Sequence, residues 1–161
     1  MDQGGRFSFS FFTKIIPSTF NESVFEVVVD FRKVKSKSKW GVIPFRIFDS
    51  GKIEVLIIST RRKNWSLPKG NLIGNLGPQR TALLEAYEEA GIDGILNPTP
   101  VLCSIGRTCI YLFPMEVTKV FQDWPESGFR KRKWIQVKKA KEMLHHRAMG
   151  KILKNFFPKK S

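Results

Sequence analysis

The sequence contains few cysteine, histidine and tyrosine residues, with two of each. Cys103 and Cys109 lie in apolar surroundings and do not form a CxxC pair, so we expect neither a disulfide framework nor a zinc site. Long apolar runs are also absent: no segment approaches the length that spans a membrane, and the start, MDQGGRFSFSFF, alternates phenylalanine with serine, unlike a secretory signal. These absences predict a soluble, cytoplasmic protein.

Acidic residues are scarce, since 14 Asp and Glu stand against 28 Lys and Arg. The resulting charge of +14 is unevenly distributed: residues 40–128 hold 9 basic and 9 acidic residues, whereas residues 129–161 hold 12 basic residues and the single Glu142. This C-terminal excess predicts contact with a polyanionic ligand, RNA or an acidic membrane surface. The alternative is an ordinary solvated helical face.

A chain of 161 residues with 42% hydrophobic residues has the size and composition of one globular domain. We expect residues 1–38 to form a partly disordered N-terminal extension, although VFEVVVDF at 24–31 has the composition of a strand. Residues 39–161 are expected to form the single domain, which ends in a basic C-terminal helix.

The first half of this domain carries clear local signals. Strand-like runs at 40–48 and 53–60 flank Asp49-Ser50-Gly51, a sequence typical of a hairpin turn, which predicts an antiparallel pair. The segment from Pro78 to Ala90 predicts a helix, with alanines at every fourth position on one face. Gly91 is expected to end this helix.

The second half is expected to contain two further strands and a helix. One strand is expected at 109–117, where Pro114 indicates a sheet edge or a bulge, and another at 132–137. The remaining residues place apolar side chains at helical spacing among lysines, which predicts an amphipathic helix interrupted at Gly150.

The helix expected at 78–90 carries an unusual acidic cluster. Glu85, Glu88 and Glu89 are spaced i, i+3 and i+4, so their side chains share one face of the helix. Carboxylate oxygens are the ligands that Mg2+ or Mn2+ accepts together with substrate phosphates. The cluster therefore favours a metal site, and a solvated acidic face is the alternative.

This cluster belongs to a longer motif that resembles the Nudix box, whose pattern is Gly-x5-Glu-x7-Arg-Glu-U-x-Glu-Glu-x-Gly-U, with U a bulky aliphatic residue. Leu76 and Leu84 stand where the pattern has its first glutamate and its arginine, and the small Ala86 fills a U position. The matching residues, in register, are Gly70, Glu85, Glu88, Glu89, Gly91 and Ile92.

Over residues 39–145 the chain is most similar to one branch of that superfamily, the diphosphoinositol polyphosphate phosphohydrolases. It lacks the glycine triplet of that branch at the entrance to the box, where it has Pro68-Lys69-Gly70. The segments that carry the resemblance are Ser59-Thr60-Arg61, Arg107-Thr108-Cys109-Ile110-Tyr111, Asp123-Trp124 and Arg130-Lys131-Arg132-Lys133-Trp134.

The resemblance implies an α/β Nudix fold, in which a mixed β-sheet is sandwiched between α-helices. It also implies a hydrolase dependent on Mg2+ (or Mn2+) that cleaves phosphoanhydride bonds in a highly anionic substrate, such as a diphosphoinositol polyphosphate or a dinucleoside polyphosphate. By resemblance, Glu85, Glu88 and Glu89 are the metal ligands and catalytic groups, with the base being one of these glutamates, Asp123 or Glu126. The expected substrate-binding residues are Arg61, Lys69, Gly70, Arg107, Arg130 and Arg132, since guanidinium groups bind phosphates with two hydrogen bonds.

Leu76 and Leu84 replace an acidic and a basic residue of the family pattern together. If those two residues form an ion pair in the family, replacing both with apolar residues changes stability little, whereas replacing only one leaves the other charge without a partner. The same two leucines motivate an alternative function, a catalytically weakened Nudix-fold protein that binds inositol phosphates, nucleotides or RNA. A third hypothesis is binding of nucleic acid or an acidic membrane by the basic C-terminal helix alone.

Overall fold

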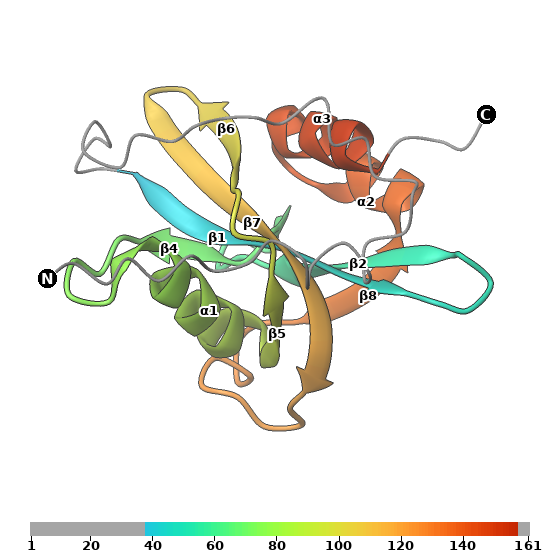
Figure 1. Cartoon of the computed structure of the whole chain (residues 1–161), viewed down its shortest axis with the longest axis horizontal. Helices are drawn as coiled ribbons and strands as arrows, with labels where there is room; N and C mark the ends of the chain where they lie inside the picture. Colours follow the sequence, from blue (N-terminus) through green and yellow to red (C-terminus); the bar gives the residue numbers. More distant parts are fainter. Residues whose placement is uncertain (1–37, 158–161) are drawn as a thin grey trace, which may run out of the picture.

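The computed structural model of the chain describes residues 38–157 (Figure 1). The strand expected at 24–31 and nearly all of the expected N-terminal extension lie outside the described residues, as do residues 158–161. None of the helices within 38–157 is long and apolar enough to span a membrane.

The described residues form one mixed sheet centred on β1 (Lys39–Ile47). β1 pairs antiparallel with β2 (Ile53–Ser59) and parallel with β7 (Thr108–Val120), giving the order β3-β2-β1-β7-β5. The predicted hairpin between β1 and β2 is therefore confirmed. The other strands are β3 (Trp65–Ser66) beside β2, β4 (Lys69–Asn71) beside β1, β5 (Ile92–Leu96) and β6 (Val101–Ile105) beside β7, and β8 (Arg132–Gln136) beside β2.

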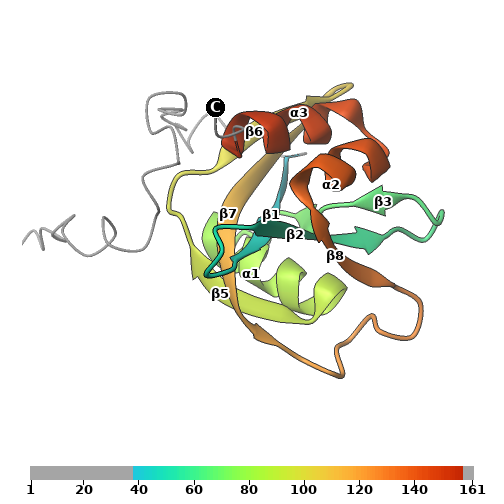
Figure 2. The same cartoon turned by 90° about the vertical axis from the view of Figure 1, so that its right-hand side faces the viewer.

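Three helices cover the sheet within the described residues: α1 (Gly77–Ala90), α2 (Val137–Met143) and α3 (Arg147–Phe156). Figures 1 and 2 show α1 on one face of the sheet and α2 with α3 on the other. This arrangement confirms the predicted α/β fold, with a mixed sheet between helices.

The two faces of the sheet bury separate cores because strand side chains alternate between them. On β1, Trp40 and Val42 pack with the α1 side, whereas Ile43 and Phe45 pack with the side covered by α2 and α3. β2 continues both layers, with Leu56 on the α1 side. Any catalytic group on α1 is thus supported by a fully buried apolar layer.

α1 forms and ends as the sequence predicts. Ala82, Ala86 and Ala90 are fully buried, and their small side chains let the helix lie close to the sheet. Gly91 has φ 62°, the left-handed conformation that glycine adopts without strain, and its N–H donates to the carbonyls of the last turn. The helix that carries the glutamates is therefore fixed at its C-terminal end.

Two expectations for the second half are wrong. β7 is an interior strand rather than an edge, and the irregularity in its pairing with β5 lies between Asp93 and Gly94 rather than at Pro114, where the neighbour on that side changes from β6 to β5. The C-terminal helix is interrupted at Leu144–His146 instead of Gly150, because Leu144 bridges to Trp65 and the N–H of His145 donates to the Trp65 carbonyl. Gly150 lies inside α3, packed against the Lys141 backbone.

Candidate functional site

Glu85 and Glu89 of α1 face the strand that carries Lys69 and Gly70. Glu89 is 9% exposed, and one of its carboxylate oxygens accepts a hydrogen bond of 2.8 Å from the backbone N–H of Lys69. Burial raises the pKa of Glu89, while this hydrogen bond and the charge of Arg130 oppose that rise. Glu89 therefore ties the end of α1 to β4.

The carboxylate of Glu85 lies directly against Gly70, where any side chain would occupy the same space. The motif therefore requires glycine at its start because the backbone of Gly70 and the carboxylate of Glu85 approach each other closely. Burial raises the pKa of Glu85 to about 7, and the negative charges of Glu89, Glu88 and Glu126 contribute further. Within residues 38–157, the Glu85 carboxylate has no hydrogen bond or ion pair to offset this repulsion.

Arg130 connects α1 to the loop before β8. Its guanidinium donates to the carboxylates of Glu89 and Glu126, and also to the backbone carbonyl of Ser59 at 2.9 Å. The N–H of Glu126 donates to the Glu88 carbonyl at 3.1 Å, which holds this loop against the helix. Glu126, one of the two alternative bases, therefore belongs to the site, whereas Asp123 is exposed in the same loop.

The chemistry of this site fits a divalent cation. The described residues contain no group of three or more His, Cys, Asp or Glu side chains arranged to hold a metal, so the three glutamates do not form a complete ligand cage. Mg2+ does not need one, because it is usually held by one or two carboxylates together with water and substrate phosphates. Glu85, which has no hydrogen bond or ion pair within the described residues, comes closest to this requirement, and Glu89 beside it also accepts from the Lys69 N–H and from Arg130.

The arginines predicted to bind phosphate are placed differently from one another. Arg61 lies in the turn between β2 and β3, exposed, with its guanidinium 4.9 Å from the ring centre of Phe129. Phe129 precedes Arg130, so Arg61 and Arg130 are brought to the same region. Arg107 is exposed in the separate turn between β6 and β7.

The side chains of two other predicted cations are hydrogen-bonded to neighbouring protein groups. Arg132 donates to the backbone carbonyls of Ala90, Gly91 and Phe121, so its guanidinium closes the C-terminal end of α1. The amino group of Lys69 donates to the Ser66 hydroxyl at 2.7 Å, and burial lowers its pKa. At Lys69 the backbone N–H, rather than the side chain, contacts the site.

Sequence reasoning missed two contributors. The peptide N–H of Lys69 leaves no trace in side-chain chemistry, and only the strand geometry of β4 aims it at Glu89. Phe129 stands in the run Phe129-Arg130-Lys131-Arg132, and an aromatic residue next to this cationic run was a visible signal.

The fold and site together define a mixed-sheet protein with a carboxylate cluster on a helix that follows a glycine-containing strand. No protein-family model matches the chain. It is 35% identical over 135 residues to "Nudix hydrolase 21, chloroplastic" of Arabidopsis thaliana, covering 74% of this chain and 66% of that protein. It is 32% identical over 142 residues to "Nudix hydrolase 12, mitochondrial" of the same plant, covering 72% of this chain and 70% of that one.

The chain belongs to the Nudix hydrolase family. It spans about two thirds of the length of these relatives. A mouse relative, "Diphosphoinositol polyphosphate phosphohydrolase 3-alpha", is 32% identical over 98 residues, covering 56% of this chain and 60% of that protein, which confirms the expected resemblance to that branch. The fold is also that of a C. elegans Ap4A hydrolase, with a TM-score of 0.58 and 21% identity over 74% of this chain and 93% of the other.

Proposed function

We propose that this protein is a Mg2+-dependent (or Mn2+-dependent) hydrolase that cleaves a phosphoanhydride bond in a highly anionic substrate, such as a diphosphoinositol polyphosphate or a dinucleoside polyphosphate. The proposal rests on the position of Glu85, whose carboxylate lies against Gly70 on the helix that carries Glu89; burial and neighbouring carboxylates raise its pKa to about 7. A partly buried carboxylate that has no ion pair within the described residues, next to other carboxylates, is suited to a divalent ion.

In this proposal some residues of the site hold the metal, and others keep the metal ligands and the neighbouring loop in position. Glu85 and Glu89 would hold the ion, with Glu88 on the same helix as the third acidic group. When bound, the ion would supply positive charge to phosphate oxygens and acidify a water molecule. Arg130 keeps Glu89 and Glu126 in place, since it donates to both carboxylates.

The reaction balances as a hydrolysis. The oxygen of a water molecule attacks one phosphorus, the bond from that phosphorus to the bridging oxygen breaks, and the second phosphate leaves with the bridging oxygen. One water proton passes to a carboxylate. Glu88 suits this role better than Glu126, because Glu126 is paired with Arg130 whereas Glu88 has no ion pair within the described residues.

Substrate phosphates are proposed to contact Arg61 and the backbone around Gly70. Arg61 is exposed and adjacent to Arg130, and it can turn a guanidinium towards an anionic ligand. Arg107 is a more distant candidate on the β6–β7 turn. Lys69 and Arg132 are left out of this set, because their donors are already used inside the protein.

The alternative is a Nudix-fold protein that binds inositol phosphates, nucleotides or RNA with little turnover. Leu76 and Leu84 favour it, because the family pattern has charged residues at both positions. α1 accordingly begins with no acidic side chain in its first turn and no side-chain cap. The two functions share a ligand class and differ only in hydrolysis.

Phosphate release distinguishes the two functions. The full chain is incubated with a diphosphoinositol polyphosphate and with a dinucleoside polyphosphate, each with Mg2+, with Mn2+ and with chelator. We expect metal-dependent release that falls roughly 100-fold or more in Glu85→Gln and in Glu88→Gln. Glu142→Gln is the matched control, since Glu142 is exposed on α2 and, among residues 38–157, is paired only with Lys139. Absence of release from every substrate under both metals would favour the binding protein.

Location and macromolecular partners stay predictions from the sequence. The cytoplasmic location was inferred from composition, and the two Arabidopsis relatives carry the words chloroplastic and mitochondrial in their own names. Contact of the basic C-terminus with RNA or an acidic surface is likewise proposed from charge alone.

A further inference from the structure

The side chain of Lys69 lies on the opposite side of the sheet from the glutamates of α1. Lys69 pairs with Gly41 of β1, and the side chains of paired strand residues point to the same face. By alternation along β1, this is the face that carries Ile43 and Phe45 and is covered by α2 and α3. A Cβ atom on Gly41 would lie 2.5 Å from the Cβ atom of Lys69, so glycine there makes room for this side chain.

The ammonium group of Lys69 is anchored at the corner between β3 and β4. It donates to the Ser66 hydroxyl at 2.7 Å and to the Leu67 carbonyl at 3.4 Å. Ser66 is buried, its hydroxyl donates to the Leu67 carbonyl at 3.2 Å, and its oxygen lies 3.8 Å from the sulfur of Met149 on α3. The ammonium is therefore tied to a corner that is packed against the core of the α2 and α3 side.

The peptide unit between Pro68 and Lys69 is held at both of its polar ends. Its carbonyl accepts from the N–H of Val42 on β1 at 3.0 Å, and its N–H donates to one carboxylate oxygen of Glu89 at 2.8 Å. The other oxygen of that carboxylate accepts from Arg130. The orientation of the Glu89 carboxylate thus depends on the plane of this peptide, and the anchored side chain of Lys69 supplies a third fixed point for the same peptide.

We propose that Lys69 is a positioning residue of the α1 site, because its anchored ammonium fixes the peptide N–H that orients Glu89 for the metal ion. This inference rests on the proposed function of the α1 glutamates. Groups that hydrogen-bond to a metal ligand orient that ligand, and their loss weakens metal binding by about 10- to 100-fold. The core on the α2 and α3 side would thereby support the metal site on the other face of the sheet.

Two measurements on the full chain test this role without turnover. NMR records the proton shift of the amide at position 69, which a hydrogen bond to a carboxylate moves downfield, and electron paramagnetic resonance measures the affinity for Mn2+. In Lys69→Met, which keeps a long side chain and loses the ammonium, we expect this amide to move upfield and Mn2+ to bind roughly tenfold more weakly. Ser66→Ala is a smaller change that should move both values in the same direction, and it carries the test if Lys69→Met does not fold.

Lys39→Met is the matched control for the loss of a nearby positive charge. Lys39 lies on β1, outside the β3–β4 corner, and its charge also acts on Glu85. Its replacement should leave the amide shift at position 69 unchanged. Ser66→Ala combined with Lys69→Met should bind Mn2+ no more weakly than Lys69→Met alone, because both changes remove the same contact.

Two results would overturn the positioning role. One is an unchanged amide shift and Mn2+ affinity in variants that only melt at a lower temperature, and the other is equal weakening of Mn2+ binding by Lys39→Met, which would reduce the role of Lys69 to charge. Metal-dependent hydrolysis together with either result would leave the hydrolase standing without this role. Weaker Mn2+ binding by Lys69→Met, in a chain that hydrolyses no diphosphate, would keep the positioning role and overturn the hydrolase.

Discussion

Glu85 determines the electrostatic behaviour of the site. Its carboxylate is pressed against Gly70, and the charges of Glu88, Glu89 and Glu126 add to the effect of burial. Deprotonation is therefore less favourable in the folded chain than in the unfolded one. In the absence of metal, this residue works against stability wherever it is ionised, which is a common property of functional sites.

Metal-free stability is expected to depend on pH through this residue. The folded pKa of about 7 lies above the ordinary glutamate value of 4.5, so the contribution of Glu85 is fully present below pH 4.5 and is lost as pH rises through about 7. Glu85→Gln should accordingly stabilise the metal-free chain at pH 8, by roughly 1 to 2 kcal/mol after allowing for its partial exposure, and change little near pH 4.

Thermal melts with chelator at the two pH values measure this difference. Added Mg2+ should raise the melting temperature of the wild type more at pH 8 than at pH 4, and should have little effect on Glu85→Gln. Equal melting temperatures for the two chains at pH 8 would show that Glu85 carries no such strain.

Residue types alone predicted an acidic cluster on one helix face, but not the direction of the cations around it. The spacing of the glutamates placed them on one helix face, and α1 carries them as expected. Lys69 and Arg132 read as phosphate ligands in the sequence, yet both are satisfied internally. Which way a long cationic side chain turns depends on tertiary neighbours such as Ser66 and the end of α1, and no local pattern encodes these.

At the scale of elements, the start of α1 differs most from the family pattern. Leu76 is the N-cap residue, with φ −89° and ψ −30°, and it makes no side-chain cap hydrogen bond. Leu84 lies two turns later and, like Leu76, is partly buried. The helix is therefore stabilised by its buried alanines and its Gly91 end rather than by charge at its start.

The paired loss of charge predicts coupling between these two positions. Leu76→Glu alone should lower the free energy of unfolding by about 1 kcal/mol or more, because it places an unpaired carboxylate in a partly buried position. Leu76→Glu with Leu84→Arg should recover most of that loss. Urea unfolding of the single and double variants checks the prediction, and equal destabilisation of the two would refute an ion-pair relationship.

Local sequence patterns predicted the elements well where short-range interactions suffice to determine them. Examples are the β1–β2 hairpin and α1, which ends at Gly91. These patterns failed where a distant strand intervenes. The helix interruption at Leu144–His146 arises from pairing with Trp65, almost eighty positions earlier in the chain. Pro114 is accommodated in an interior strand because β5 and β6 share one side of β7 and meet there.

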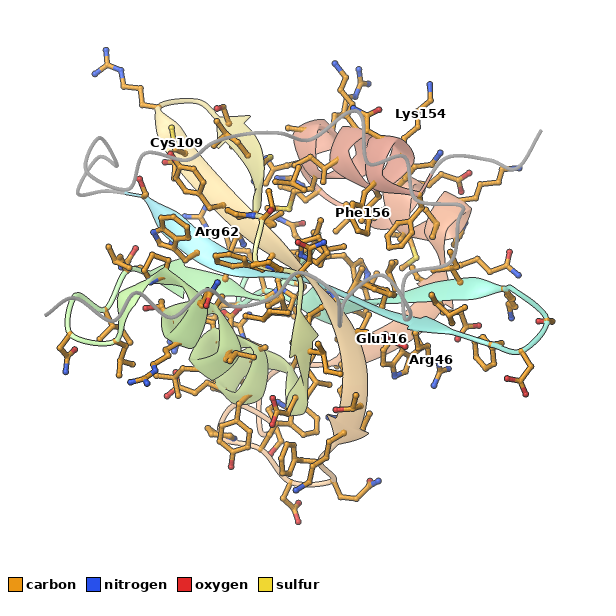
Figure 3. The ribbon with its side chains drawn as sticks, in the orientation of Figure 1. Arg46, Arg62, Cys109, Glu116, Lys154 and Phe156 are labelled. Atoms are coloured by element: carbon orange, nitrogen blue, oxygen red, sulfur yellow. The ribbon has the colours of Figure 1, made fainter. Side chains whose placement is uncertain are left out.

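Across the whole molecule, the basic surface of the C-terminal helices is separated from the glutamate site by the sheet (Figures 1 and 2). Figure 3 shows Lys154 pointing away from the sheet, while Phe156 lies on the inner side of α3 and contacts Phe45. Met149 and Leu153 of α3 are fully buried. Removing these helices would therefore destroy the core, so their charge has to be tested by substitution.

If this surface binds polyanions, the association should depend steeply on salt. Lys151→Glu with Lys154→Glu should reduce the salt slope of binding to single-stranded RNA by about one to two, measured by fluorescence anisotropy, without changing hydrolysis. Lys52→Glu with Lys119→Glu is the matched control at exposed positions elsewhere. A slope that is the same for both double variants would indicate a solvated face.

The central claim is that the α1 carboxylates form a metal-dependent hydrolytic site despite Leu76 and Leu84. Its most direct test is phosphate release from a dinucleoside polyphosphate by the wild type, Glu85→Gln and Glu142→Gln while Mg2+ is titrated from zero. We expect saturable, Mg2+-dependent release by the wild type and Glu142→Gln, and a rate at least about 100-fold lower for Glu85→Gln. Release that is independent of Mg2+, or equal in all three chains, would contradict it.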